Sequence, residues 1–216
     1  MQELFMALKQ DTLEKHTTLE QTPPFSLFHN LSTFSPSLYD DVLSVMSVFH
    51  STTSSHVSNA ISNTPCLAAL AEMLNTDEVS AALKRDKQTQ EACTLESQNL
   101  EDQKINALKS QLTFRGQHSA AIAAMYVWLG SSMGANVISR RLTALNSDIP
   151  TEYYSAMAAC AKAWIPFKQN VGHILTELKL DDDDGVRDIV EDAKSWFSFL
   201  IALGKAQTDQ QAQPSQ

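Results

Sequence analysis

The chain has 216 residues, of which 43% are hydrophobic and 19% are charged. A chain of this length and apolar content can bury a sizeable core, so it is expected to fold and not to remain disordered. Its formal net charge of −9 argues against nucleic acid as the main partner, because the phosphate backbone attracts a basic surface.

Residues 1–20 are predicted to form an amphipathic helix. Its apolar stripe follows the spacing of one helix face and contains Leu4, Leu8, Thr12, His16 and Leu19. Pro23 and Pro24 end the helix, since proline removes a backbone donor and restricts the residue before it. The pattern therefore places His16 on or near the inward face.

His16 is followed one turn later by Glu20. A neutral imidazole can bind a metal through one nitrogen while the other nitrogen donates to a carboxylate, which fixes the tautomer. The same position also suits a hydrogen-bonded core histidine that binds nothing. Both interpretations of His16 are open at this point.

The middle of the chain is predicted to be a series of helices separated by prolines. A short turn or helix is expected around residues 25–28, a longer helix at Ser35-Pro36, and another at Pro65. The polar stretch 84–103 has weak periodicity. The sequence contains no strand-like alternation with hairpin turns, so it predicts an all-α fold.

The three cysteines, Cys66, Cys93 and Cys160, are scattered and form no pair at metal-binding spacing. They are expected to be free thiols in a reducing compartment, so the protein is predicted to be cytoplasmic. The sequence shows no signal-peptide pattern and no apolar run near twenty residues, so membrane insertion is not expected.

The stretch from Ser119 to Leu142 is apolar, free of proline and predicted to be a long helix. Gly130 and Gly134 lie one turn apart within it, although each interior glycine costs about 1 kcal/mol relative to alanine. Together with Ala135 they clear side chains from one face, so a flat, bulky group could approach the backbone. A close helix–helix crossing or a kink would use the same residues.

Two further helices are predicted after Pro150. The aspartates at 181–184 are expected to form a solvated loop that favours the N-terminus of the last helix electrostatically. Residues 206–216 are polar and are expected to be a disordered tail. Residues 1–205 are then one helical domain, since no linker-like stretch divides them.

Two stretches carry a resemblance to a known family. LKQDTLEKHTTLEQ, residues 8–21, resembles the first helix of the haem oxygenases, whose proximal histidine lies in a Thr-x-x-x-His-x-x-x-Glu setting. YVWLGSSMGANVISRRL, residues 126–142, resembles their distal helix, especially the bacterial form with Gly-Ser-x-x-Gly. The order of the motifs and the chain length also fit. The resemblance implies an all-α, single-domain fold with haem between the N-terminal helix and the glycine-bearing helix.

The resemblance implies roles for individual residues. His16 is the implied axial ligand of the haem iron, and Glu20 is the carboxylate that orients it. Gly130 and Gly134 are the implied backbone positions over the iron. Ser131 stands where mammalian members have an aspartate that organises water, and a serine hydroxyl cannot carry that negative charge.

The haem propionates need cationic or hydroxyl partners. Lys9 lies seven residues before His16, on nearly the same helix face, and matches a family position at which lysine reaches a propionate. Arg141 lies seven residues after Gly134, and Tyr126 is expected to line the pocket. The ordinary alternatives are that Lys9 and Arg141 contact water and that Tyr126 lies in the core.

The implied activity is that of a haem oxygenase. Such an oxidoreductase uses dioxygen, and electrons from a reductase or ferredoxin, to cleave haem to biliverdin, carbon monoxide and ferrous iron. The chain departs from the family pattern at Leu129, a position often acidic in bacterial members, and at Ala135, which replaces the second glycine of the mammalian pair. One alternative is therefore a haem carrier or sensor that does not degrade its ligand. Another alternative is a helical interaction protein without haem, in which the glycines only permit close packing.

Overall fold

The computed structural model describes residues 2–28, 33–93, 100–144 and 149–211. In these ranges the α-helices are α1 (Gln2–Asp11), α2 (Leu13–Gln21), α3 (Phe25–Phe28), α4 (Pro36–Asn63), α5 (Ala68–Ala71), α6 (Thr76–Cys93), α7 (Asp102–Ser110), α8 (Gln117–Ala144), α9 (Glu152–Cys160), α10 (Trp164–Leu178) and α11 (Asp183–Gln211). Short 3₁₀ turns η1, η2 and η3 cover Pro65–Leu67, Glu72–Leu74 and Ala161–Ala163. The described ranges contain no strand, which confirms the predicted all-α class.

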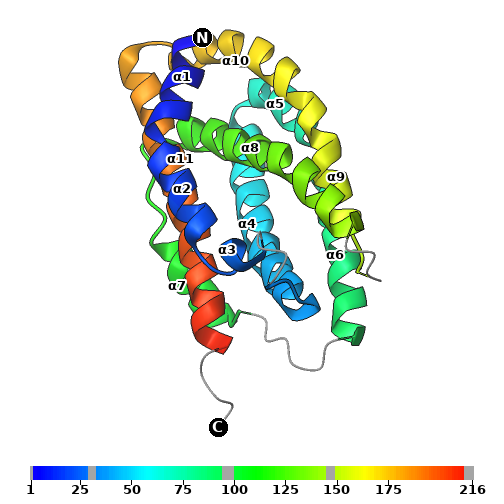
Figure 1. The fold of residues 1–216 in the computed structure, drawn as a ribbon. Coiled ribbons are helices and arrows are strands. Elements are labelled where there is room, and N and C mark those ends of the chain that lie inside the picture. Colours follow the sequence, from blue (N-terminus) through cyan, green and yellow to red (C-terminus); the bar gives the residue numbers. More distant parts are fainter. Residues whose placement is uncertain (1, 29–32, 94–99, 145–148, 212–216) are drawn as a thin grey trace.

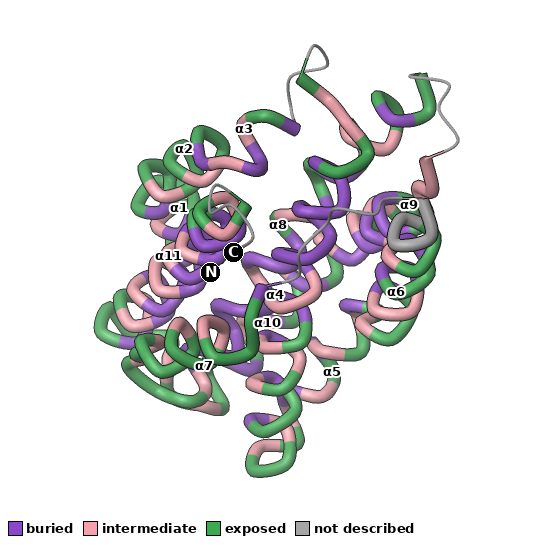
Figure 2. Tube along the Cα trace, turned by 90° about the horizontal axis from the view of Figure 1, so that it is seen from below, coloured by how far each residue is buried: buried purple, intermediate pink, exposed green. Residues whose placement is uncertain are grey.

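Helix α8 crosses the middle of the molecule and packs against α4, α9 and α11 (Figure 1). Buried residues concentrate where these helices face one another (Figure 2). The largest fully buried side chains include Trp128, Trp196, Tyr39, Tyr153 and Phe49. The long helix predicted between Ser119 and Leu142 is therefore the central helix of the core.

Helix α8 is also the one helix in the described ranges that is long and apolar enough to cross a membrane. The sequence was expected to contain no apolar run of about twenty residues, and by length and composition α8 contains one. More than half of the most apolar stretch of α8 is buried inside the fold. Contact with the three surrounding helices accounts for the apolar character of the buried part of α8.

The start of α8 is tied to α11 by buried polar contacts. Asp192 accepts hydrogen bonds from the Arg115 backbone N–H at 2.8 Å and from the Ser119 hydroxyl at 2.6 Å. Trp196 Nε1 donates to the Ala120 carbonyl at 2.9 Å. Burial raises the pKa of Asp192, while these hydrogen bonds act to lower it. The contacts hold the first turn of α8 at a fixed position on α11.

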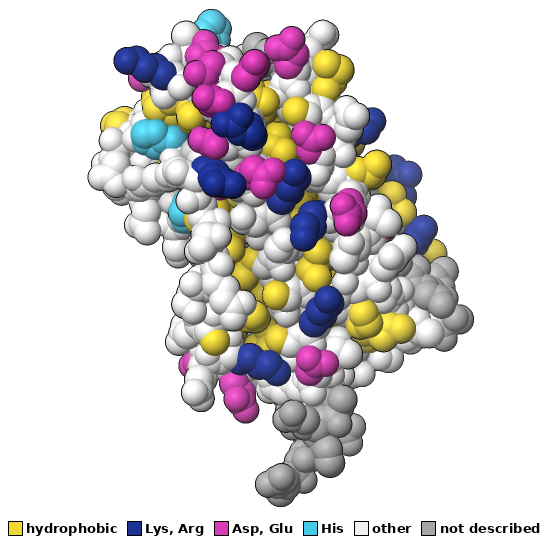
Figure 3. Space-filling model, turned by 90° about the vertical axis from the view of Figure 1, so that its left-hand side faces the viewer, with side chains coloured by type: hydrophobic (Ala, Val, Ile, Leu, Met, Phe, Trp, Pro, Cys, Tyr) yellow, Lys and Arg dark blue, Asp and Glu magenta, His cyan; other side chains and the backbone are white. Residues whose placement is uncertain are grey.

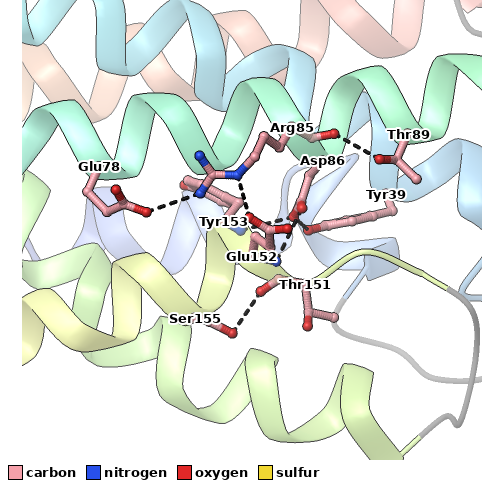
Figure 4. Close-up of polar contacts among 9 residues, drawn as sticks. All are labelled: Tyr39, Glu78, Arg85, Asp86, Thr89, Thr151, Glu152, Tyr153 and Ser155. Carbon is pink, nitrogen blue, oxygen red and sulfur yellow. Dashed lines mark hydrogen bonds and ion pairs between the residues drawn. The ribbon is translucent and has the colours of Figure 1, made fainter.

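The start of α9 is held by Asp86, a buried residue of α6 (Figure 4). Its carboxylate accepts from the backbone N–H groups of Glu152 at 3.2 Å and Tyr153 at 3.0 Å. The Tyr39 hydroxyl donates to the same carboxylate at 2.9 Å. Thr151, the residue before α9, makes no side-chain cap. A residue distant in sequence therefore satisfies the backbone donors that a local cap would otherwise satisfy.

Two predicted helix starts have the expected local contacts. Ser35 accepts from the Leu38 backbone N–H at 3.1 Å, and Pro36 occupies the first turn of α4. At the start of α11, Asp182 Oδ1 accepts from the Gly185 backbone N–H at 2.8 Å. Both are side-chain caps of the kind that serine and aspartate make, and both are readable from neighbouring residues.

The predicted helix over residues 1–20 is divided into α1 and α2 at Thr12. The Thr12 hydroxyl donates to the Leu8 carbonyl at 2.6 Å, and the His16 N–H still donates to the Thr12 carbonyl at 2.9 Å. A threonine hydroxyl that donates to the carbonyl of the preceding turn competes with the backbone hydrogen bond of a regular helix for that carbonyl. The apolar stripe is buried as predicted at Leu4, Leu8 and Thr12, but His16 is exposed.

Helix α11 extends past the predicted domain boundary at residue 205. Residues 206–211 are helical, and Ala206 and Gln207 are buried. Gln207 Nε2 donates to Asp41 Oδ1 on α4 at 2.9 Å. The predicted tail therefore begins too early, because polar side chains can hydrogen-bond to the core and not only to water. Residues 212–216 lie outside the described ranges.

Candidate functional site

The N-terminal helices meet α8 at a contact between Thr12 and Tyr126. Burial raises the pKa of the Tyr126 hydroxyl, while its polar contact with the Thr12 side chain lowers it. The Phe5 and Tyr126 rings lie 6.4 Å apart between centroids. Tyr126 is thus half-buried between the helices and packs against the core.

His16 and Gly130 each lie one helical turn beyond this contact, on α2 and α8 respectively. From there α2 packs along α11 and α3, whereas α8 continues toward α9 (Figure 1). The two helices therefore diverge just where His16 and the two glycines occur. The residues one turn before each predicted motif are therefore in contact.

His16 is an accessible side chain and not a core histidine, since 54% of it is exposed. Its Nδ1 atom lies 3.6 Å from Glu20 Oε1, within one turn of α2. The Phe197 ring of α11 meets the His16 ring edge to face, with 5.9 Å between centroids. In the described part of the chain no hydrogen bond to Nε2 is present. Glu20 can therefore orient the imidazole through one nitrogen while the other stays accessible.

Gly130 and Gly134 do not lie at a helix crossing. A Cβ atom added to either residue would meet nothing within 4 Å, and both residues are exposed. Helix α8 is also helical without interruption through both positions. The interpretation of these glycines as residues of a close helix–helix crossing is therefore wrong, and the open helix face that a flat, bulky group would need is present.

The exposed stripe that contains the glycines continues along α8. Met133 and Val137 are 54% and 51% exposed, although both are large and apolar. Arg141 follows Val137 by one turn and is exposed. Uncovered apolar side chains next to one another commonly mark a binding surface. This stripe offers an apolar surface with a cation at its far end.

The Ser131 hydroxyl is committed to its own helix. It donates to the Trp128 carbonyl at 2.6 Å, and the neighbouring Ser132 hydroxyl donates to the Leu129 carbonyl at the same distance. Ser131 is half-buried and Ser132 is buried. With its proton used in this way, Ser131 can still accept a hydrogen bond through its remaining lone pair.

Lys9 lines a cavity between α1 and α10 with a volume of about 850 Å³. Phe5, Met6 and Ile165 supply apolar surface there, and Lys168 brings a second ammonium group. The Lys168 Nζ atom also lies 5.7 Å from the centre of the Trp164 ring. Sequence reasoning missed Lys168, because no local pattern relates residue 168 to residue 9. Only the packing of α10 beside α1 brings the two cations together.

The other histidines do not form a metal centre. His50 is fully buried, its Nε2 lies 2.8 Å from the Tyr153 hydroxyl, and burial lowers its pKa to about 3. His118 Nε2 lies 2.7 Å from Thr64 Oγ1. Among the residues that the structure describes, no group of three His, Cys, Asp or Glu side chains could hold a metal ion. Cys66 and Cys160 are free thiols, and the Cys93 side chain lies outside the description.

The surface formed by α1, α2, α7 and α11 carries charges of both signs. Lys and Arg side chains are interspersed with Asp and Glu, with apolar side chains between them (Figure 3). A surface that binds nucleic acid requires a concentrated basic field. This face does not provide one.

Comparison with protein families agrees with this geometry. A family model described as heme oxygenase matches residues 2–206, which is nearly the whole chain. The chain therefore belongs to the heme oxygenase family, whose members bind and degrade haem. No curated protein and no solved structure shows a significant match to it.

The residues present fit haem as a substrate. His16 offers an accessible imidazole nitrogen, and the glycine stripe of α8 offers an apolar face onto which a flat ring can settle. Lys9, Lys168 and Arg141 supply cations at the margins of these apolar surfaces.

Proposed function

We propose that this chain is a haem oxygenase of the bacterial type, which cleaves haem to biliverdin, carbon monoxide and ferrous iron. One observation carries the proposal. The accessible His16 imidazole and the open glycine face each lie one turn beyond the Thr12–Tyr126 contact between α1–α2 and α8. This arrangement offers an iron ligand and an open helix face from two segments distant in sequence.

His16 binds the haem iron through its accessible nitrogen. Glu20 Oε1 lies 3.6 Å from Nδ1, so a small side-chain movement lets it accept a hydrogen bond from Nδ1–H and hold the imidazole in the tautomer that can coordinate. The Phe197 ring restricts rotation of the imidazole by its edge-to-face contact. Glu20 and Phe197 are positioning residues, because both act through His16.

Gly130 and Gly134 leave the backbone of α8 open to the opposite side of the haem. With no side chain at either position, dioxygen has room and backbone groups can approach it. Met133 and Val137 contact the porphyrin ring and exclude water from it. Ser131 accepts a hydrogen bond from ordered water, since its own proton goes to the Trp128 carbonyl.

The two haem propionates are bound by cations. Lys9 and Lys168 line one apolar cavity, so they can pair with carboxylates while the ring lies against apolar side chains. Arg141 provides a further cation at the end of the glycine stripe. Lys168 is the addition that the structure makes to the predicted residues.

The haem supplies the redox chemistry when it is bound, and the protein supplies position, exclusion of water and hydrogen bonds. Electrons come from a separate reductase or ferredoxin. The free thiols Cys66 and Cys160 favour a reducing compartment, so we place the protein in the cytoplasm.

A haem carrier or sensor is the second candidate, and one observation favours it. Ser131 replaces an acidic side chain and donates its only proton to α8 itself. Such a site organises water less strongly than a carboxylate does, which slows oxygen chemistry without preventing haem binding.

One experiment separates these candidates. The protein is loaded with haem without oxygen, then given dioxygen and a reductant, and followed by absorption spectroscopy. An oxygenase loses its Soret band and gains a broad red bilin absorption. A stable ferrous–dioxygen spectrum identifies a carrier or sensor, and failure to bind haem rejects both.

A further inference from the structure

Trp128 lies behind the open glycine face of α8. Trp128 and Gly130 are two residues apart, so the two positions project about 200° apart around the helix. The indole is buried on the core side, and the half-buried Ser131 hydroxyl donates to the Trp128 carbonyl at 2.6 Å. A group bound on the glycine face is therefore separated from the indole by the thickness of one helix, which is about 10 Å.

Aromatic rings continue from Trp128 across the core. The His50 ring lies 4.0 Å from the Trp128 ring and 5.7 Å from the Tyr153 ring, between centroids. The Tyr153 and Tyr154 rings are 4.9 Å apart, and the Tyr154 and Tyr39 rings are stacked at 6.0 Å. Indole and phenol are the aromatic side chains that lose a single electron most readily. Helices α4, α8 and α9 thus place four oxidisable rings in one continuous row, with an imidazole between the first two.

Two of these tyrosines have a proton acceptor bonded directly to the hydroxyl. The Tyr153 hydroxyl oxygen lies 2.8 Å from His50 Nε2, and the Tyr39 hydroxyl donates to Asp86 Oδ2 at 2.9 Å (Figure 4). Burial lowers the His50 pKa and keeps the imidazole neutral, so Nε2 accepts the Tyr153 proton in the tautomer protonated on Nδ1. A phenol that loses an electron becomes a strong acid. A bonded base therefore lets the proton leave together with the electron.

Trp128 differs from these tyrosines, because its Nε1 atom is buried and has no hydrogen-bond partner within the described part of the chain. An oxidised indole at this position keeps its proton and remains a radical cation, which is a stronger oxidant than a tyrosyl radical. It therefore takes an electron from Tyr153. Phenylalanine at positions 39 and 153 would fill the same core volume without burying a hydroxyl, so packing alone does not require these two hydroxyls.

The Tyr39 end of the row lies close to the protein surface. Asp86 accepts from the Glu152 backbone N–H at 3.2 Å, and the Glu152 side chain pairs with Arg85, which is 48% exposed (Figure 4). Tyr39 itself is buried. A small electron donor at this surface is thus one layer of side chains away from the Tyr39 ring.

We propose that Trp128, Tyr153, Tyr154 and Tyr39 form a one-electron relay, which reduces bound haem after hydrogen peroxide has oxidised it. The ring row is a property of the fold, whereas its oxidant rests on the proposed function. Trp128 gives an electron to the haem and regains one from Tyr153, whose proton moves to His50 Nε2.

The remaining steps return every residue to its starting state. The Tyr153 radical regains an electron from Tyr39 through the Tyr154 ring, and its proton returns from His50. The Tyr39 proton moves to Asp86 and returns when a thiol in solution reduces the Tyr39 radical. Two such passages oxidise two thiols to a disulfide and reduce one hydrogen peroxide to two water molecules, so atoms and electrons balance.

The relay is tested first on the full chain without haem, so its outcome does not depend on the proposed function. Tyr126→Phe is the starting protein, because Tyr126 is the one tyrosine outside the row and its ring contacts Trp164. An ultraviolet pulse ejects an electron from indole, and hexaamminecobalt(III) in solution captures it. Transient absorption then follows the indole and phenoxyl radicals. Indole-radical decay and phenoxyl growth are expected to share one rate, which falls in D₂O because a proton moves with the electron.

Substitutions assign the pathway. Trp128→Phe and Tyr153→Phe each abolish this phenoxyl growth, whereas Trp164→Phe, at another tryptophan, leaves it unchanged. His50→Gln keeps a hydrogen-bond acceptor without a basic nitrogen, so the growth slows by about 100-fold or more, as expected for loss of a general base. Unchanged phenoxyl growth in folded Tyr153→Phe, or an equal rate in H₂O and D₂O, overturns the relay.

A second experiment tests the link to haem. The Tyr126→Phe protein is loaded with haem, checked by its Soret band, mixed with hydrogen peroxide and frozen. Electron paramagnetic resonance should show a tyrosyl radical whose signal narrows with ring-deuterated tyrosine. The radical is lost when Tyr153→Phe is added, and Tyr39→Phe slows its removal by glutathione. A working relay without this radical would show that haem is not its oxidant. Since no step requires biliverdin, absence of biliverdin alone rejects only the proposed function.

Discussion

The two halves of α8 are both rich in small and apolar residues, but they have opposite environments. From Ser119 to Leu129 every residue except Tyr126 is buried. In the second half, up to Ala144, only Ser132, Ala135 and Leu142 are buried. The first half packs inside the core, whereas the second carries the open glycines and the uncovered apolar side chains.

This difference shows that apolar character within one helix serves two purposes. In the first half it stabilises the fold, because water is excluded between α8 and its neighbours. In the second half Met133 and Val137 gain less from the fold, since each is more than half exposed. The proposed haem would bury the rest. Four predictions test this division, and they follow from the largest expected effect to the smallest.

His16→Ala tests whether the open half of α8 faces an iron ligand. Loss of the axial nitrogen alters the Soret spectrum. It also lowers turnover by more than the loss of a residue that only orients a metal ligand, which costs roughly 10–100-fold. Added imidazole restores the spectrum in part. His173→Ala, at another exposed histidine, serves as the control and leaves both unchanged. A His16→Ala spectrum identical to that of the unmodified protein would show that another residue binds the iron.

Gly134→Leu tests the open half directly. The added side chain meets no protein atom at its Cβ, so the free energy of unfolding stays the same or rises by up to about 1 kcal/mol from helix propensity. Haem turnover is lost, because the side chain occupies the space for dioxygen. Melting temperature and turnover are measured on one preparation.

Two matched variants complete this test. Ala121→Leu in the buried half of α8, and Gly204→Ala in α11, should each cost about 1–3 kcal/mol of stability by overpacking. A Cβ on Gly204 would lie 2.8 Å from the Pro23 carbonyl oxygen. If Gly134→Leu destabilises the protein as much as these variants do, the division of α8 into a core half and a site half is wrong.

The buried half of α8 also predicts a pH dependence of stability through His50, whose ring lies 4.0 Å from that of Trp128. Burial lowers the His50 pKa from 6.5 to about 3, so the folded protein keeps the imidazole neutral while the unfolded chain takes up a proton. The unfolding free energy therefore falls below pH 6.5, by about 1.4 kcal/mol per pH unit, until the folded pKa is reached.

The slope of the unfolding free energy with pH is measured by urea unfolding between about pH 7 and pH 5. The unmodified protein is compared with His50→Gln. Glutamine keeps a hydrogen-bond acceptor for Tyr153 but does not titrate. Asp86 and Asp192, whose pKa values burial raises, contribute to both proteins and cancel in the comparison. Equal slopes would show that His50 is not held neutral by the fold.

Tyr126→Phe tests the boundary between the two halves. It removes the half-buried hydroxyl beside Thr12 while keeping the ring beside Phe5. The loss of this polar contact should lower stability by up to about 1 kcal/mol. Thermal unfolding measures this change, and haem titration shows whether α1–α2 keeps its place beside α8. An unchanged melting temperature would mean that the aromatic packing alone holds this contact.

Some helix starts were predictable because their signals lie between neighbouring residues. Ser35-Pro36 starts α4, and the aspartates before Gly185 start α11. The polar end of α11 was not predictable in this way, because Gln207 is held by Asp41 of another helix. A hydrogen bond between segments distant in sequence has no local pattern.

The sequence by itself determined the helical class, the central helix and the two motifs at His16 and at Gly130–Gly134. Spacing along one helix decides which side chains share a face, and a motif is recognised from the order of its residues without the fold. The roles of these residues toward haem stay predictions that the experiments above test.

Only the tertiary structure decided what surrounds these residues. It left His16 accessible, opened the face at Gly134, paired Lys168 with Lys9, and placed His50 between Trp128 and Tyr153. An exposed and a buried half of one apolar helix have the same local pattern. The difference between them arises only when neighbouring helices cover one half and leave the other uncovered.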